Sequence, residues 1–216
     1  MLPRRGRARN PGIIFTHSFW DKESYLNGEQ MKHLMIDIEA MDDKPTAAIT
    51  AIAAVFFNPE SGEVGKTFYR RISLDDAMSH GGTVSAEAIT WLLRQPEAVR
   101  DQLLDDDCQD IELAICDFYE FVNENTDYQT VKLWSSCPSL HSAVLRNALN
   151  KFAGQCFTYG NEQSVITIVE LATALGLNME NIIPYAFDGN AYNKAIHNIK
   201  VVSYVWTYLL KIASVK

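Results

Sequence analysis

The apolar run from Leu34 to Met41 constrains the fold of this chain more than any other stretch. It reads LMIDIEAM and ends at the polar sequence DDKP. Side chains alternate across a β-strand, so Asp37 and Glu39 are predicted to point to one face while their neighbours provide apolar cover. Two carboxylates on one face repel each other unless a cation lies between them or one is protonated. The run therefore predicts a strand that holds a divalent metal through oxygen ligands, with a solvated acidic face as the alternative.

The composition is that of a single domain with a substantial core. The chain has 216 residues, of which 47% are hydrophobic and 11% aromatic, and this length suits one domain of ordinary size. No apolar run approaches the roughly 20 residues that cross a membrane, and the cluster at residues 13–15 is too short for a secretory signal. We therefore expect a soluble protein with no membrane partner.

The cysteines predict a reducing compartment. They lack both the C-x-x-C spacing of a metal site and the density of a disulfide-rich secreted chain, so a cytoplasmic location is expected. We interpret all four as small buried apolar residues and not as zinc ligands: Cys108, Cys116, Cys137 and Cys156.

Charge is distributed unevenly along the chain. Residues 1–30 hold five basic and three acidic side chains, whereas residues 31–216 hold 14 basic and 24 acidic ones, a net charge of −10. An acidic body disfavours passive binding to nucleic acid, because phosphate contacts need lysine and arginine. Residues 1–30 show no sustained period and precede Met31, a natural start, so we interpret them as a disordered or upstream extension to a domain at 31–216. A basic arm that touches nucleic acid is the alternative.

From Met31 onward the pattern predicts a mixed-sheet α/β domain. Three apolar or alternating runs with short connections predict an antiparallel meander of strands at 34–40, 47–57 and 66–73. A further strand is predicted at 131–134. Capping signals and a 3.6-residue apolar period predict helices on the faces of the sheet, at 83–93, 96–104, 111–122, 138–152, 164–175 and 193–210. The acidic residues 105–107 are expected in solvent, in a loop or at a helix start.

In this order, the elements resemble the DEDD superfamily of 3′-5′ exonucleases, and within it the phage-type branch. The resemblance is carried by MIDIEAM, by the following Ala-Ala-Ile at 47–49 and by TVSAEAITW at 83–91, and it covers residues 31–210. It implies an RNase H-like fold with a mixed central β-sheet flanked by helices. It also implies Mg²⁺ or Mn²⁺ ions flanking the scissile phosphate, a single-stranded DNA or RNA 3′ end as partner, a homodimer, and a phage or prophage origin in a bacterial cytoplasm.

The resemblance implies four metal-binding carboxylates and a water-activating histidine, and only part of this set is present. Asp37 and Glu39 match the first pair. Other residues occupy the remaining positions: Leu140 and His141 at the third carboxylate, Gln163 and Ser164 at an Arg-Asp pair, and Asn193 and Asn198 at the two ends of an H-x-x-x-x-D motif. A site with roughly two negative charges holds divalent cations weakly. Loss of the general base alone slows hydrolysis by about 10²- to 10⁴-fold.

Three hypotheses follow. In the first, the protein is a degenerate exonuclease that serves as a binding or regulatory module. In the second, it hydrolyses 3′ ends with a metal on Asp37 and Glu39 and a substitute ligand, either Asp188 or His141; a histidine with two carboxylates suits Mn²⁺ or Zn²⁺ better than Mg²⁺. His197 is rotated by roughly 100° from Asn198 on a helix and is expected to point away from the site. In the third, the protein is a non-enzymatic dimer whose interface uses Trp91, Tyr204, Trp206 and Tyr208.

Overall fold

A five-stranded mixed sheet forms the centre of the molecule. The computed structural model describes residues 31–103, 107–155, 157–186 and 188–214. The strand order is β3-β2-β1-β4-β5. The antiparallel meander consists of β1 (His33–Ala40), β2 (Ile49–Phe57) and β3 (Val64–Arg71), whereas β4 (Lys132–Ser135) and β5 (Glu162–Ser164) add parallel strands beside β1. The predicted mixed sheet with its meander is therefore confirmed.

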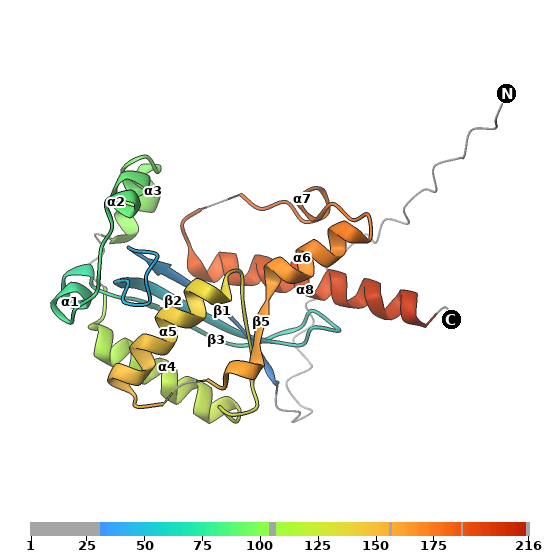
Figure 1. The fold of residues 1–216 in the computed structure, drawn as a ribbon, viewed down its shortest axis with the longest axis horizontal. Coiled ribbons are helices and arrows are strands. Elements are labelled where there is room, and N and C mark those ends of the chain that lie inside the picture. The colour runs from blue at the N-terminus through green and yellow to red at the C-terminus, as the bar shows by residue number, and fades with distance from the viewer. Residues whose placement is uncertain (1–30, 104–106, 156, 187, 215–216) are drawn as a thin grey trace.

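Helices cover both faces of the sheet (Figure 1). One face packs against α1 (Leu74–Ser79), α4 (Ile111–Asn125) and α5 (Pro138–Phe152). The other packs against α6 (Val165–Ala174), α7 (Met179–Ile182) and the long α8 (Ala191–Ala213). The short helices α2 (Ala86–Leu93) and α3 (Glu97–Arg100) stand at one end of the sheet, followed by the 3₁₀ turn η3 (Asp101–Leu103); a second such turn, η4 (Tyr159–Asn161), precedes β5.

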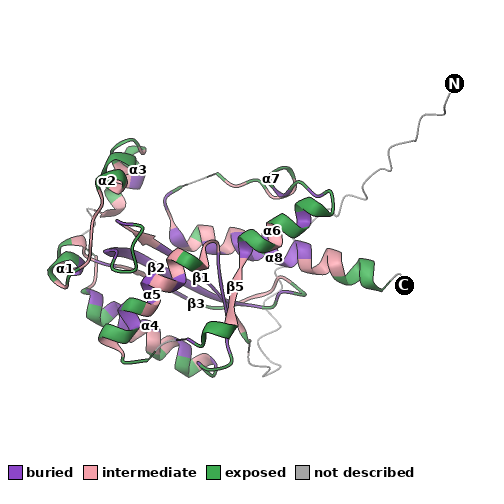
Figure 2. Cartoon of the chain, viewed as in Figure 1, coloured by how far each residue is buried: buried purple, intermediate pink, exposed green. Residues whose placement is uncertain are grey.

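The alternation of β1 divides the apolar side chains into two cores. Leu34, Ile36 and Ile38 join the core under α4 and α5, while Met35 joins the core under α8. Figure 2 shows buried central strands, and helices α4 and α8 that combine buried with exposed residues. The predicted apolar face of α4 is buried in full, at Ile111, Ala114, Ile115, Phe118 and Val122. Its 3.6-residue period is thus a reliable guide to the side that contacts the sheet.

Three elements differ from the sequence-based expectation because they are too short to show a period. Helix α1 has six residues, and its N-cap is Ser73, whose hydroxyl accepts the Asp76 N–H at 3.3 Å. Strand β5 has three residues, none of them apolar, and exists because it pairs with β4. Helix α7 is a single turn. The helix expected at 96–104 is also shorter, because α3 passes into a 3₁₀ turn at Asp101.

The prediction that the cysteines are buried is wrong for the three that the structure describes. Cys108, Cys116 and Cys137 are of intermediate exposure. Cys137 is the N-cap of α5, whereas Cys116 lies within α4 and its Sγ donates to the Phe152 carbonyl oxygen at 3.8 Å. Cys156, residues 105–106 and the segment 1–30 lie outside the described residues. Among the helices that are described, none has the length and apolarity to cross a membrane.

Candidate functional site

The carboxylates of Asp37 and Glu39 lie on the face of β1 that α8 covers. Opposite them on β2 stand Ala53 and Ala51, which belong to the core under α8. Directly opposed residues of an antiparallel pair share a face, and the small alanine side chains leave room there for the two acids. Asp37 is buried, with 7% of its surface exposed. The strand thus places two carboxylates side by side under a helix.

His141 reaches Asp37 because β4 is short. On its β1 side, strand β4 pairs with the first three residues of β1 and then ends, so α5 begins beside the later part of β1. The His141 Nδ1 atom lies 3.6 Å from Asp37 Oδ1, beyond hydrogen-bonding distance. Both atoms are buried, and neither has a hydrogen-bond partner among the residues that the structure describes. Two unsatisfied polar atoms therefore face each other at the site.

Burial shifts the pKa of all three side chains toward the neutral form. It raises the pKa of Asp37 to about 7, opposed by the charge of Lys194 and reinforced by Glu39. It raises the pKa of Glu39 to about 7, opposed by a hydrogen bond from the Ala191 N–H. Burial and then Lys194 lower the pKa of His141 to about 4. The imidazole is therefore neutral at pH 7, and its contact with Asp37 is not an ion pair.

The start of α8 brings further polar groups to the site. The Ala191 N–H, in the first turn of α8, donates to the Glu39 carboxylate, the usual way in which a helix N-terminus holds an anion. Asn193 is exposed, and its amide donates to Asp188 Oδ2 at 2.7 Å. Asn198 is buried at 3% exposure, and its Nδ2 has no hydrogen-bond partner within the described part of the chain. The two asparagines of α8 thus have different surroundings: Asn193 hydrogen-bonds the loop before the helix, whereas Asn198 is buried.

Asp188 is held in the loop before α8. Its carboxylate accepts hydrogen bonds from the Asn190 N–H at 3.1 Å and from the Tyr185 hydroxyl at 3.4 Å, in addition to the one from Asn193. Its charge raises the pKa of Glu39. Asp188 therefore acts on Glu39 through its charge, while its carboxylate oxygens accept hydrogen bonds from Tyr185, Asn190 and Asn193.

His197 and the residues of β5 have structural surroundings of their own. The His197 ring packs against Tyr185 with centroids 4.6 Å apart, in a pocket that Met179 and Ile183 also line. Ser164 is the N-cap of α6 and accepts the Thr167 N–H at 3.2 Å, and the Gln163 side chain donates to the Asn161 carbonyl oxygen at 3.4 Å.

Lys194 is a site residue that the family motifs do not single out. Its charge lowers the pKa of both Asp37 and His141. Its Nζ lies 4.4 Å from the centre of the Tyr185 ring. The sequence carries one signal for it, since Lys194 follows Ala191 and precedes Asn198 by about one helical turn each, on the side of α8 that is buried.

The residues present do not fit a two-metal centre. Within the described ranges, no three His, Cys, Asp or Glu side chains converge as a metal-binding group. Asp37, Glu39 and His141 therefore do not form the predicted set of a histidine with two carboxylates. A cation entering beside them would also meet the positive charge of Lys194.

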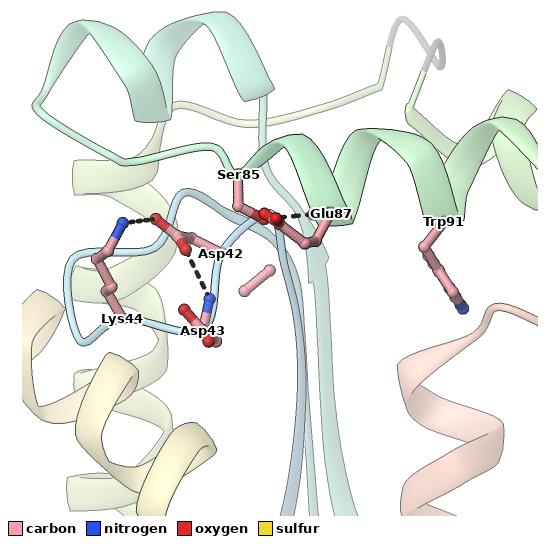
Figure 3. Close-up of a pocket in the computed structure, with 8 residues that line it drawn as sticks. Asp42, Asp43, Lys44, Ser85, Glu87 and Trp91 are labelled. Carbon is pink, nitrogen blue, oxygen red and sulfur yellow. Dashed lines mark hydrogen bonds and ion pairs between the residues drawn. The ribbon is translucent and has the colours of Figure 1, made fainter.

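A second hollow lies where β1 ends (Figure 3). It has a volume of about 370 Å³ and is lined by Ala40, Asp42, Asp43, Lys44, Ser85, Glu87, Ala88 and Trp91. Lys44 Nζ pairs with Asp42 at 3.2 Å, and a hydrogen bond from Thr83 leads the contacts that lower the pKa of Asp42 to about 2. The indole of Trp91 points from α2 on the side opposite Lys44, with half of its surface exposed.

Several solved structures have a fold similar to that of this chain. Escherichia coli exonuclease I in complex with a dT13 oligonucleotide has a TM-score of 0.62 at 12% identity, covering 84% of this chain and 42% of that chain. A product-bound exonuclease I has a TM-score of 0.58 at 14% identity (85% and 46%), and cell-death related nuclease 4 has 0.52 at 9% (83% and 64%). These likenesses show the RNase H-like fold alone, and the chain spans less than two thirds of each of these proteins. No curated protein matches the sequence.

The family itself is shown by a match over most of the chain. Residues 32–206 match the family described as the 3′-5′ exoribonuclease Rv2179c-like domain. This range includes the five strands, the carboxylate pair of β1 and the start of α8. The chain therefore belongs to the 3′-5′ exoribonuclease Rv2179c-like family, within the DEDD superfamily of 3′-5′ exonucleases.

Proposed function

We propose that this protein binds the 3′ end of single-stranded nucleic acid and has lost most of its phosphodiesterase activity. The observation that carries the proposal is the make-up of the site. Asp37 and Glu39 are retained, but His141, Asn193 and Asn198 stand where the resemblance expects further charged or catalytic groups, and the charge of Lys194 on α8 acts on Asp37. Family membership supports nucleic acid as the ligand.

Charge explains why hydrolysis would be impaired. Two-metal hydrolysis needs anionic oxygens that offset the dehydration of both cations. Burial raises the pKa of both carboxyls to about 7, so each is partly protonated at neutral pH. The site consequently presents less negative charge than its two acids suggest, and Lys194 reduces it further.

Hydrolysis and binding can be measured on the same preparation. A 5′-labelled single-stranded oligonucleotide, in RNA and DNA versions, is incubated with the protein and Mn²⁺ or Mg²⁺, and its binding is followed by fluorescence anisotropy. We expect saturable binding, and hydrolysis no faster than that of Asp37→Asn. Metal-dependent shortening from the 3′ end that disappears in Asp37→Asn would refute the proposal, and absence of binding to both polymers would refute its nucleic-acid part.

One observation favours an active enzyme as the second candidate. Asp37 Oδ1 and His141 Nδ1 are unsatisfied and 3.6 Å apart, and the imidazole is neutral, so they could hold one Mn²⁺ or Zn²⁺ or position a water molecule. This candidate predicts hydrolysis with Mn²⁺ that is lost in both Asp37→Asn and His141→Ala.

The proposal also includes the remaining expectations from the sequence. They are the phage-type branch and phage or prophage origin, the homodimer, a regulatory role, a bacterial cytoplasmic location, and a domain at 31–216 preceded by an extension. Light scattering of the purified protein measures the mass directly and decides between monomer and dimer.

A further inference from the structure

We propose that His33 is an acid-sensitive link between the sheet and the C-terminal turns of α8, residues 206–213. The neutral imidazole joins β1, β2, β4 and α8 at the start of β1, and a proton on this ring releases the end of the helix. The inference goes beyond the proposed function, because it concerns how α8 is held on the sheet and depends on neither metal nor nucleic acid.

The His33 ring accepts a hydrogen bond that a protonated ring cannot accept. The indole Nε1–H of Trp134 donates to His33 Nδ1 at 2.9 Å. Because the indole nitrogen is only a donor, His33 Nδ1 has to present a lone pair, and the proton of the neutral ring is on Nε2. In an imidazolium both nitrogens carry protons, so two N–H groups would face each other. Protonation of His33 therefore breaks its bond to Trp134.

Aromatic side chains from three elements surround the His33 ring. Phe57, its partner on β2, packs edge-on with ring centroids 5.8 Å apart. Trp206 of α8 also packs edge-on, at 6.0 Å. Trp134 of β4 lies 6.1 Å from the His33 ring and 6.3 Å from the ring of Trp206. His33 thus lies in the contact between α8 and the sheet, among rings that provide no anion to stabilise an imidazolium.

Lys132 of β4 is a charged group that acts on His33. The two residues are register partners of β4 and β1, and the Lys132 ammonium donates to Asn161 Oδ1 at 2.7 Å. From β2 and α8 the ring meets Phe57 and Trp206, which carry no charge. Burial, and then the charge of Lys132, lower the pKa of His33. Both causes favour the neutral ring that the bond from Trp134 requires.

The end of α8 has little burial to hold it. Each residue from 206 to 213 is exposed or of intermediate exposure, whereas the helix is still buried at Val205. Apart from the ring contacts of Trp206, a hydrogen bond from Thr207 Oγ1 to the carbonyl oxygen of exposed Glu60, at 3.0 Å, fixes this part. Segments with few buried contacts open locally while the rest of a domain stays folded. Loss of the contacts around His33 should therefore free these two turns.

The sign of the pH dependence follows from the two states of His33. In a released segment a histidine has a pKa of about 6.5, and the docked ring has a lower pKa. The released state therefore binds a proton that the docked state does not, and the equilibrium shifts toward release as the pH falls below about 6.5. Each unit by which the pKa is lowered increases the opening constant by up to about tenfold.

Hydrogen exchange of the α8 amides in the full chain measures the release. Exchange in residues 206–213 is followed from pH 8 to pH 5 and corrected for the intrinsic pH dependence of amide exchange. In the wild type we expect the opening constant to rise about tenfold over this range, with little change in residues 191–205. In His33→Asn it should not depend on pH, because the amide oxygen can accept the Trp134 bond and does not titrate.

His80→Asn is the matched control. His80 is the C-cap of α1, on the opposite face of the sheet, and its ring packs on Phe152 with centroids 5.7 Å apart. This variant should keep the pH response of the wild type. A wild-type opening constant that does not change with pH, or an equal rise in His33→Asn, overturns the proposal. If His33→Asn does not fold, the ring signals of wild-type His33 in an NMR titration decide, since a pKa at or above about 6.5 overturns the proposal as well.

Discussion

The free energy of unfolding of Asp37→Asn, measured relative to that of the wild type, should increase as the pH rises from acidic to alkaline values. Burial raises the pKa of Asp37 to about 7, whereas an aspartate in the unfolded chain has a pKa of about 3.9. Between these values the folded protein holds a proton that the unfolded chain has released. The free energy of unfolding of the wild type therefore falls as the pH rises through this window. Asparagine has nearly the same shape and no charge, so the variant lacks this contribution.

The size of the effect follows from the part of the window above pH 5. From pH 5 to a pKa of about 7 there are two units, and at roughly 1.4 kcal/mol per unit they amount to about 3 kcal/mol. Glu39 shifts in the same direction but is present in both proteins, so it largely cancels in the difference. The free energy of unfolding of Asp37→Asn minus that of the wild type should thus be about 3 kcal/mol larger at pH 8 than at pH 5.

Urea denaturation at pH 5, 6, 7 and 8 measures this difference. The control is Asp43→Asn, an exposed aspartate of the turn after β1, which should change the free energy of unfolding by less than about 0.5 kcal/mol at each pH. Parallel pH profiles for the wild type and Asp37→Asn would refute the reasoning, because they would mean that Asp37 titrates alike in the folded and unfolded states.

Three further substitutions test the packing that positions the site. Phe118→Ala should lower the free energy of unfolding by about 3 to 5 kcal/mol in urea, because this fully buried ring contacts Phe68 and Phe157; a loss below about 1 kcal/mol would contradict the packing. Gly189→Ala should cost about 1 to 3 kcal/mol in thermal or urea unfolding, since Gly189 has φ +70° and a Cβ there would lie 2.6 Å from Val99 Cγ1; an unchanged midpoint would argue against this backbone conformation. Arg146→Met should cost about 3 kcal/mol, because Arg146 pairs with half-buried Glu162 and donates to the Phe157 carbonyl oxygen at 2.6 Å; restoration by an added Glu162→Gln would identify the unpaired carboxylate as the cause.

The sequence alone determined the elements whose period is long enough to show. The alternation of β1 and the apolar face of α4 depend on neighbours a few residues away, so the local sequence is sufficient to predict them. Elements that depend on contacts between residues far apart in the sequence could not be predicted in this way. Strand β5 has no apolar residue and exists through its pairing with β4, and α1 needs the cap of Ser73 and its packing against β2. Such short elements gain their stability from tertiary contacts and leave little trace in local composition.

The candidate site divides in the same way. That Asp37 and Glu39 share a face follows from the strand alone, and the resemblance to the DEDD exonucleases is carried by the same residues. The tertiary structure decided which groups act on them: His141 from α5 and the charge of Lys194 for Asp37, and the Ala191 N–H for Glu39. The family motifs point to Asn193 and Asn198 but pass over the lysine between them. The charge that an acid experiences depends on distance and burial in three dimensions, and a spacing in the sequence cannot supply either quantity.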